Sequence, residues 1–339
     1  MNDPEEELST LWTSDPHTIR TFLERRPDYA RLCDEVSYIL EKRLSAKPIE
    51  ISAITSRVKS LKSLAEKIVR KEYRDPFKEI TDLAGVRVVY LYKGDLPAIQ
   101  QIIEEQFVVL ERVNKLDQMA PNEFGYGALH YLVRLGRQSS GARYDDLKEL
   151  TCEIQVRTVL QDAWAIIDHH LIYKHESDIP SHLQRPIRGF AGTFENTDDH
   201  LDRIHSEREK YLRVIRNSRK NTNEFLSRPL DLDTLTEYLT WKFSHLGAAR
   251  QPGQITRVLS FAQEANIETL AELDDYVNRS AAARDAVAQE INLTSAAAAV
   301  TWTLMFFFPF MSERLHWTDS ALRAIEKYRS LVESPGAPA

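Results

Sequence analysis

Apolar residues recur at three- and four-residue spacing in the N-terminal part of the chain. Residues 16–25 and 29–44 each show this spacing, which is typical of an amphipathic helix. Pro48 marks a break, and a more basic segment follows, which we expect to form a third helix from about Ser56 into Arg70. The N-terminal part of the chain is therefore predicted to be helical.

From Val86 the pattern changes to short β-branched and aromatic runs, which are typical of strands. These runs cover residues 86–92, 108–115, 129–135 and 152–156, and residues 97–107 are predicted to form a helix between the first two. Strands interleaved with helices indicate a mixed α/β domain. From Val159 the helical pattern returns and continues nearly to the end of the chain.

These patterns predict an α/β (α+β) fold with three regions. They are N-terminal helices over residues 1–50, an α/β catalytic region over 51–225 and an all-α region of unknown role over 226–339. The apolar stretch 291–310 is interrupted by polar residues and by Pro309, so we expect a buried helix there and no membrane span.

Composition narrows the class of protein further. A formal net charge of -7 argues against broad, non-specific binding of nucleic acid. Cys33 and Cys152 are the two cysteines, which excludes a disulfide framework and a cysteine-rich zinc site, and a buried thiol is expected at Cys152. The acidic N-terminus is unlike a secretory leader, so a cytoplasmic location is predicted.

A basic segment is the first candidate for chemistry. On the predicted helix, Lys59, Ser63, Lys67 and Arg70 share one face, and Arg57 precedes them. Several cations beside a hydroxyl group suit a polyphosphate. The alternative is a solvated amphipathic surface, because charged residues are plentiful in this segment.

Two acidic segments are the second candidate. Asp82 and Arg87 lie on either side of Gly85 where the first strand is expected to begin. A carboxylate beside phosphate oxygens is a typical magnesium environment; the alternative is that Asp82 caps a turn in which Gly85 supplies backbone freedom. In the last predicted strand, Glu153 and Gln155 alternate onto one face together with Arg157. That face is expected to be either nucleotide-facing or part of an exposed edge strand.

Between these segments, Gly125 and Gly127 lie on either side of Tyr126. Glycines next to a tyrosine let its ring project from a loop and stack on a base. His130 follows and is suited to phosphate binding or proton transfer. A hairpin turn whose aromatic ring packs on the sheet is the alternative.

Taken together, these motifs resemble the RelA/SpoT-type (p)ppGpp synthetase domain. Their order and spacing match it, and so does the segment from Ala163-Trp164-Ala165 through Asp168-His169 to Tyr173-Lys174. The resemblance covers roughly residues 50–210. Because no His-Asp hydrolase motif precedes it, we expect a small, synthetase-only member, a small alarmone synthetase.

The resemblance implies a nucleotidyltransferase-like mixed sheet flanked by helices. It also implies Mg²⁺-dependent transfer of the β,γ-pyrophosphate of ATP to the 3′-hydroxyl of GDP or GTP. ATP would be bound by Arg57, Lys59, Ser63, Lys67, Arg70 and Arg87; Mg²⁺ by Asp82, with Glu153 as a second ligand or as the base; and the acceptor by Tyr126, His130 and Gln155.

The acceptor loop departs from the family pattern. Gly127 and Ala128 occupy positions where the family usually has an arginine, lysine or glutamine followed by serine. An alternative hypothesis is therefore a toxin-like relative that pyrophosphorylates the 3′ end of tRNA or another nucleotide acceptor. The C-terminal region is expected to pack on the catalytic unit, to form a homo-oligomer interface or to bind an antitoxin partner.

Overall fold

The computed structural model describes residues 4–71, 73, 75–114, 127–171, 180–246, 252–290, 295–308 and 319–333. The chain divides into two compact units, Met1–Ser206 and Glu207–Ala339. The first unit ends inside helix α7, whereas the sequence pattern placed the end of the α/β region at residue 225.

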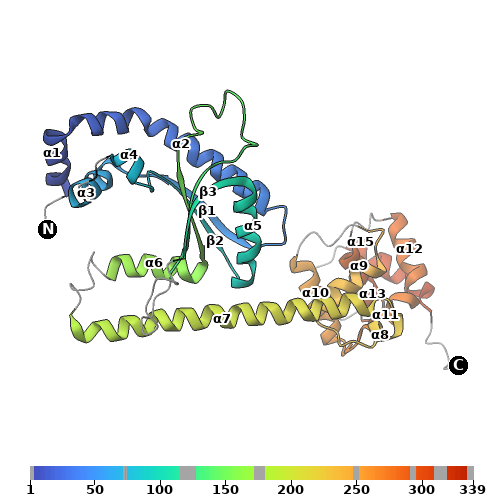
Figure 1. Cartoon of the computed structure of the whole chain (residues 1–339). Coiled ribbons are helices and arrows are strands. Elements are labelled where there is room, and N and C mark those ends of the chain that lie inside the picture. Colours follow the sequence, from blue (N-terminus) through green and yellow to red (C-terminus); the bar gives the residue numbers. More distant parts are fainter. Residues whose placement is uncertain are drawn as a thin grey trace. The chain divides into compact units, whose positions relative to one another are not determined.

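The first unit combines a five-stranded sheet with helices (Figure 1). Its elements are α1 (Pro4–Ser14), α2 (Pro16–Leu44), β1 (Ile51–Val58), α3 (Leu61–Lys71), α4 (Pro76–Glu79), β2 (Ala84–Tyr90), η1 (Lys93–Asp95), α5 (Leu96–Gln106), β3 (Phe107–Asn114), β4 (Leu129–Leu135), β5 (Cys152–Thr158), α6 (Val159–Leu171) and most of α7 (Ser181–Ser218).

The sheet has the strand order β1-β2-β5-β4-β3 and is mixed. The β2 and β5 strands run parallel, and the other neighbours are antiparallel. The four strands expected from sequence are therefore confirmed, and so is the helix between the first two. Because β2 and β5 are neighbours, the two acidic segments lie side by side, with Gly85 paired to Glu153.

Two predictions for the N-terminal part were wrong. The segment from Ser56 was expected to be helical, but Ile51–Val58 forms the edge strand β1, and helix α3 begins only at Leu61. Pairing with β2 determines this outcome, because a strand is stabilised by distant partners that a local pattern does not reveal. Residues 16–44 form one continuous helix, α2, which passes through Pro27.

The main core of the first unit lies on one face of the sheet. The inward-facing side chains of β2 and β5 are fully buried; α2 packs against both strands, and α5 packs against α2 and β3. This core includes Leu32, Val36, Leu40, Val86, Val88, Ile99, Ile103, Ile154 and Val156. Each such side chain contributes about 1.5–3 kcal/mol through burial. Cys152 is also buried here, as expected.

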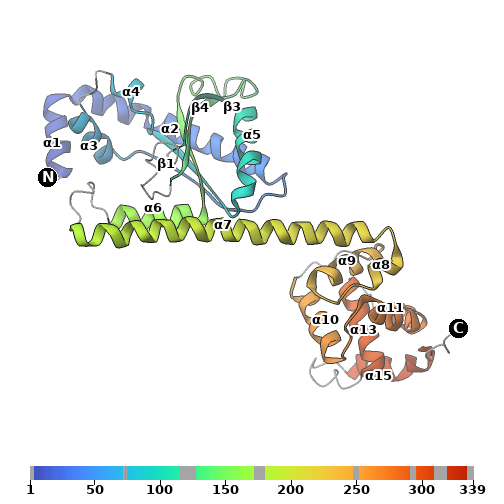
Figure 2. The ribbon, with the colours of Figure 1, turned by 60° about the horizontal axis from the view of Figure 1, so that its bottom comes forward.

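The end of β5 is tied to the helices that follow it. The Thr158 hydroxyl donates to a carboxylate oxygen of Asp198 on α7, at 2.6 Å. Trp164 of α6 packs with Ala191 and Phe194 of α7, and the two helices lie side by side in Figures 1 and 2. These contacts hold the first turn of α6 at the end of the sheet.

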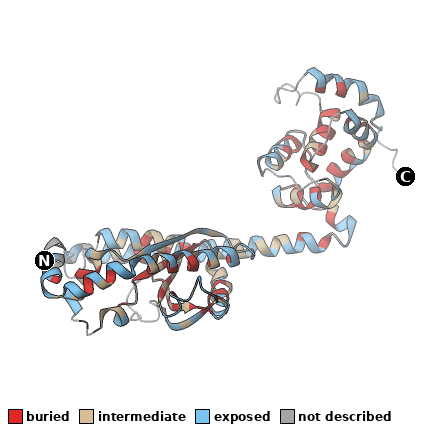
Figure 3. Ribbon diagram, turned by 90° about the horizontal axis from the view of Figure 1, so that it is seen from above, coloured by how far each residue is buried: buried red, intermediate tan, exposed pale blue. Residues whose placement is uncertain are grey.

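The second unit is entirely helical in its described part. After the end of α7 come α8 (Thr222–Leu226), α9 (Leu232–Lys242), α10 (Pro252–Glu264), α11 (Leu270–Arg279), α12 (Ala281–Glu290), α13 (Ala296–Phe307), α15 (Asp319–Tyr328) and η4 (Arg329–Leu331). In Figure 3, buried residues (red) are interspersed with exposed ones (pale blue) along the helices of both units.

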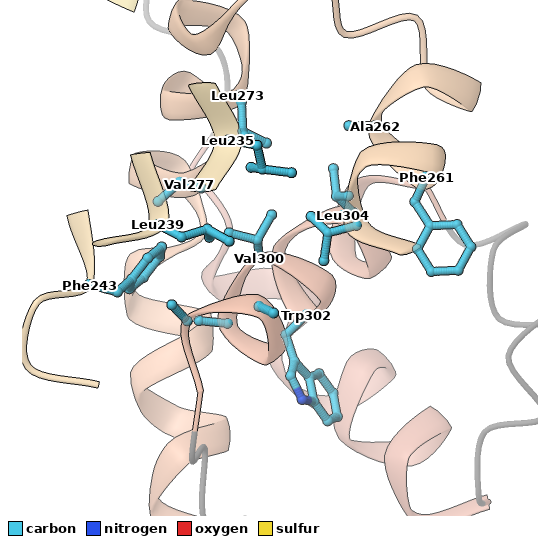
Figure 4. Close-up of a cluster of buried hydrophobic side chains, with 14 of the residues drawn as sticks. Leu235, Leu239, Phe243, Phe261, Ala262, Leu273, Val277, Val300, Trp302 and Leu304 are labelled. Carbon is cyan, nitrogen blue, oxygen red and sulfur yellow. The ribbon is translucent and has the colours of Figure 1, made fainter. Parts of the chain in front are cut away.

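Helix α13 is the centre of the second unit. Side chains of α9, α10 and α11 gather around Val300 and Leu304 (Figure 4). The expectation of a buried helix in the apolar stretch is confirmed for Ala296–Phe307. Among the described residues, no helix has the length and apolar character needed to cross a membrane.

Candidate active site

An open cavity of about 190 Å³ lies over the polar face of the sheet. Residues of β1, β2 and β5 and of the turn before β2 form its walls: Thr55, Ser56, Arg57, Asp82, Gly85, Val86, Arg87, Glu153 and Gln155. The cavity thus brings together Arg57, Asp82, Arg87, Glu153 and Gln155 from the residues expected to act in the site.

The register of three strands explains the shape of this cavity. Arg57 of β1 pairs with Gly85 of β2, which in turn pairs with Glu153 of β5. A Cβ atom at Gly85 would lie 3.8 Å from the Arg57 carbonyl oxygen and 3.9 Å from that of Glu153, which is ordinary contact. Among the described glycines, only Gly141 has a positive φ, so Gly85 is not needed for backbone freedom. Gly85 lines the cavity between Arg57 and Glu153 and places no side chain there.

Asp82 is held by two lysines. Lys59 Nζ lies 2.7 Å from Asp82 Oδ2, and Lys67 Nζ lies 2.9 Å from Asp82 Oδ1. The Lys59 amide donates to the Leu83 carbonyl oxygen, which brings the chain after β1 beside the turn before β2. Burial acts to raise the pKa of Asp82, but the hydrogen bonds and charges of the lysines outweigh it, so the pKa lies below its ordinary value. Asp82 is therefore an ionised carboxylate that binds lysine side chains.

The other members of the basic segment lie differently from the single helical face that was expected. Lys59 precedes α3, whereas Ser63, Lys67 and Arg70 are within it. The Ser63 hydroxyl accepts from Ser60 at 2.9 Å, and Arg70 is exposed in the last turn. Neither Ser63 nor Arg70 is part of the cavity wall formed by the described residues.

Glu153 is held in place by its neighbours on the sheet. His130 Nδ1 lies 2.8 Å from Glu153 Oε1, and the Gln155 side-chain amide donates to Oε2 at 2.9 Å. Burial acts to raise the pKa of Glu153, but these two hydrogen bonds and the charge of His130 outweigh it and lower the pKa. The second ring nitrogen of His130 is buried without a hydrogen-bond partner among the described residues.

Two arginines, one of them in the cavity wall, share one carboxylate. Asp162, in the first turn of α6, lies 3.0 Å from Arg87 Nη1 and 3.7 Å from Arg157 Nη1. Burial and the nearby charge of Arg87 lower the pKa of Arg157. The Nε atoms of both arginines are buried and lack a partner among the described residues. This cluster carries excess positive charge, which suits a phosphate group.

Sequence reasoning missed the role of Asp162. The signal available was an acid in the first turn of the helix that directly follows a strand with Arg157 near its end. That signal is weak, because acids are common in the first turn of any helix.

Tyr126 lies outside the described residues, as do Gly125, Tyr173 and Lys174. The next described residue is Gly127, two residues before β4. The proposed stacking of the tyrosine on an acceptor base thus stays a prediction.

The donor atoms of the cavity are suited to Mg²⁺. Asp82 and Glu153 both face it, and their lowered pKa values keep both carboxylates ionised at neutral pH. Among the described residues, no group of three or more His, Cys, Asp or Glu side chains is placed to hold a metal. Since Mg²⁺ commonly takes one or two protein carboxylates and completes its shell with phosphate oxygens, the residues fit a metal that binds with a nucleotide.

Comparison with known families gives a match over the part of the chain that forms the cavity. Residues 56–178 match the family described as a region found in RelA / SpoT proteins. The matched segment begins in β1 and contains the whole cavity wall except Thr55. The part of the chain that carries the site is therefore similar to the RelA/SpoT region.

Individual relatives are similar over about half of this chain. GTP pyrophosphokinase YjbM of Bacillus subtilis (strain 168) is 27% identical over 183 residues, which are 52% of this chain and 82% of that protein. GTP pyrophosphokinase YwaC of the same organism is 27% identical over 158 residues, which are 45% of this chain and 72% of that protein. The crystal structure of small alarmone synthetase 1 from Bacillus subtilis aligns with a TM-score of 0.47 at 23% identity, over 56% of this chain and 98% of that chain.

Proposed function

We propose that this chain transfers the β,γ-pyrophosphate of ATP to the 3′-hydroxyl of GDP or GTP, which yields the alarmone (p)ppGpp and AMP. The RelA/SpoT region supports the reaction class, and the names of the two GTP pyrophosphokinase relatives support a guanine nucleotide as acceptor. A cytoplasmic location, where these nucleotides are found, is part of the proposal.

The observation that carries the proposal is the composition of the cavity. Two ionised carboxylates, Asp82 and Glu153, face it together with Arg57 and Arg87, and Gly85 leaves the space between them open. Pyrophosphoryl transfer needs this combination, because the reacting group is highly charged and catalysis depends mainly on alignment and charge neutralisation.

The cations of the site are assigned to the donor. Arg57 and Arg87 reach the cavity from β1 and β2, and Lys59 and Lys67 surround Asp82 at its edge. In this assignment they bind the polyphosphate of ATP, with Ser63 and Arg70 completing the donor site as the resemblance implies. Arginine contributes planar, bidentate contacts, and lysine contributes compact charge.

Asp82 and Glu153 are the residues that would hold Mg²⁺. The ion, when bound, would neutralise charge on the transferred phosphates and help to orient them. Both carboxylates are ionised for this purpose by their own hydrogen-bond partners, without help from a metal.

The acceptor nucleotide is assigned to the side of Glu153 that faces away from the proposed ATP site. The 3′-oxygen attacks the β-phosphorus, the bond between that phosphorus and the oxygen bridging to the α-phosphate breaks, and AMP departs with that oxygen. Where it does not serve as a metal ligand, Glu153 would accept the hydroxyl proton, and His130 and Gln155 fix the orientation of its carboxylate. Tyr126 would stack on the guanine.

The experiment is an acceptor panel. Purified full-length protein is incubated with γ-labelled ATP and Mg²⁺ plus GDP, GTP, ATP or deacylated tRNA, beside an authentic (p)ppGpp synthetase as positive control. We expect label on GDP and GTP and none with the Glu153→Gln variant. Label on tRNA alone would overturn the guanine-nucleotide assignment in favour of the toxin-like alternative. Absence of transfer to every acceptor would overturn both.

A further inference from the structure

The carboxylate of Asp82 has both oxygens bound by lysine. Oδ2 accepts from Lys59 at 2.7 Å, and Oδ1 accepts from Lys67 at 2.9 Å. The side chains are largely enclosed, with exposed fractions of 12% for Lys59 and 23% for each of the other two. We call Lys59 and Lys67 the lysine pair. Their position decides what can reach Asp82.

The lysine pair opposes a divalent cation. Two ammonium groups and one carboxylate carry a net positive charge, so a metal ion approaching Asp82 meets repulsion, which is strong at partly buried sites. The second proposed ligand, Glu153, also has both oxygens engaged, by His130 and Gln155. Neither carboxylate therefore offers a ready site to a free metal ion.

A nucleotide triphosphate changes this balance. Its phosphates carry several negative charges, whereas Asp82 carries one, so they compete effectively for lysine ammonium groups. Lys67 is well suited to such an exchange, because it lies within α3, keeps partial access to solvent and has a flexible four-carbon side chain. Once the ammonium groups turn to phosphate, the oxygens of Asp82 become available.

We propose that the lysine pair makes divalent-metal binding at Asp82 conditional on the triphosphate: the free protein has no standing metal site, and the metal binds only together with the nucleotide. The proposal rests on the proposed function insofar as it takes a nucleoside triphosphate as the donor. The lysine pair thereby has two roles, as a counter-charge for Asp82 in the free protein and as a phosphate ligand in the complex.

The test measures metal binding without turnover. Mn²⁺ is titrated into full-length protein without nucleotide, and free Mn²⁺ is followed by electron paramagnetic resonance. We compare the wild type with Lys67→Met and with Lys62→Met, a matched control for an exposed lysine on the same helix. We expect Lys67→Met to bind Mn²⁺ at least tenfold more tightly than the wild type, which is about 1.4 kcal/mol. The control should behave as the wild type.

Further variants make the result specific. Adding Asp82→Asn to Lys67→Met should abolish the gained Mn²⁺ affinity, and Lys59→Met provides a second route to the same gain if Lys67→Met does not fold. In the wild type, Mn²⁺ should raise the affinity for a non-hydrolysable ATP analogue. Wild-type protein that binds Mn²⁺ without nucleotide as tightly as the lysine variants would overturn the proposal, and so would a gain that survives Asp82→Asn.

The outcomes separate this inference from the proposed function. A chain that shows the expected Mn²⁺ behaviour and yet transfers no pyrophosphate would refute the proposed function, but it would support the inference about the lysine pair. A chain that makes alarmone but binds Mn²⁺ tightly without nucleotide would support the proposed function and refute the inference about the lysine pair.

Discussion

Replacing Asp82 by asparagine should destabilise the first unit, because it removes the charge that two partly buried lysines share. The substitution keeps the size of the side chain and leaves one oxygen acceptor. In the wild type, the two ammonium groups lie 2.7 and 2.9 Å from oxygens of the Asp82 carboxylate. In the variant, Lys59 and Lys67 would lose this shared negative charge.

The magnitude follows from the geometry. A hydrogen bond to a charged group contributes about 1.5–3 kcal/mol when enclosed. Fully exposed ion pairs contribute about 0–1 kcal/mol. The exposed fractions of 12% and 23% place this cluster between those limits. The lysines can also turn partly to water, so we expect a loss of about 2 kcal/mol in total, or about 4–8 °C in Tm for a unit of this size.

The stability difference between wild type and Asp82→Asn should also depend on pH. The pKa of folded Asp82 lies below its unfolded value, so the stabilisation is complete above the unfolded pKa of about 3.9 and is lost as pH falls through the folded pKa. The stability difference between wild type and Asp82→Asn should therefore stay constant from neutral pH down to about 5 and shrink below about 4.

The assay is urea unfolding, followed by circular dichroism and by tryptophan fluorescence, at several pH values between 7 and 3. Asp145→Asn is the control, since Asp145 pairs with Lys148 at 2.7 Å but is 61% exposed. It should cost less than about 1 kcal/mol. Equal stability of Asp82→Asn and wild type at pH 7, or a difference that does not shrink in acid, would refute this account of the cluster.

Four further substitutions, one of them a control, test other parts of the structure. Gly136→Ala would place a Cβ 2.2 Å from a neighbouring carbonyl oxygen and should cost about 1–3 kcal/mol in unfolding experiments, whereas Gly189→Ala, with nothing within 4 Å, should be neutral or stabilising. Tyr238→Phe removes a buried donor to Asp274 at 2.7 Å and should lower the stability of the second unit by about 1–2 kcal/mol, measured by thermal unfolding. Glu153→Gln should reduce pyrophosphate transfer at least about 100-fold with an unchanged circular dichroism spectrum, and retained activity would remove Glu153 from the mechanism.

Much of the sheet was predictable from local pattern. The strand Leu129–Leu135 has the bounds that its run of β-branched and aromatic residues predicted, and one of its faces is buried throughout. The edge strand β1 was not predictable in this way. The basic spacing that begins at Arg57 and continues into α3 suggested a helix from Ser56, and only pairing with the distant strand β2 makes Ile51–Val58 a strand.

The residues that line the site could be predicted from the sequence, but the contacts between their charged side chains could not. Asp82, Arg87 and Glu153 were expected from the acids and cations beside predicted strands, and the structure places all three around one cavity. The contacts of Asp82 with Lys59 and Lys67 join residues that are 23 and 15 positions apart, and no local pattern encodes them.

The role of the second unit stays a prediction. Its helices bury a core of their own around α13, so packing on the first unit is not needed to enclose the apolar stretch. Homo-oligomer formation and binding of a neutralising partner are both open to test by size-exclusion chromatography with light scattering.

The central claim is transfer of an intact pyrophosphate group, and product analysis tests it most directly. Protein, ATP, GDP and Mg²⁺ are incubated together, and the products are separated and identified by ³¹P nuclear magnetic resonance and mass spectrometry. The account predicts AMP and a guanosine nucleotide bearing a diphosphate on its 3′-oxygen, in equal amounts. Formation of ADP with a singly phosphorylated acceptor, or of AMP without any modified guanine nucleotide, would contradict it.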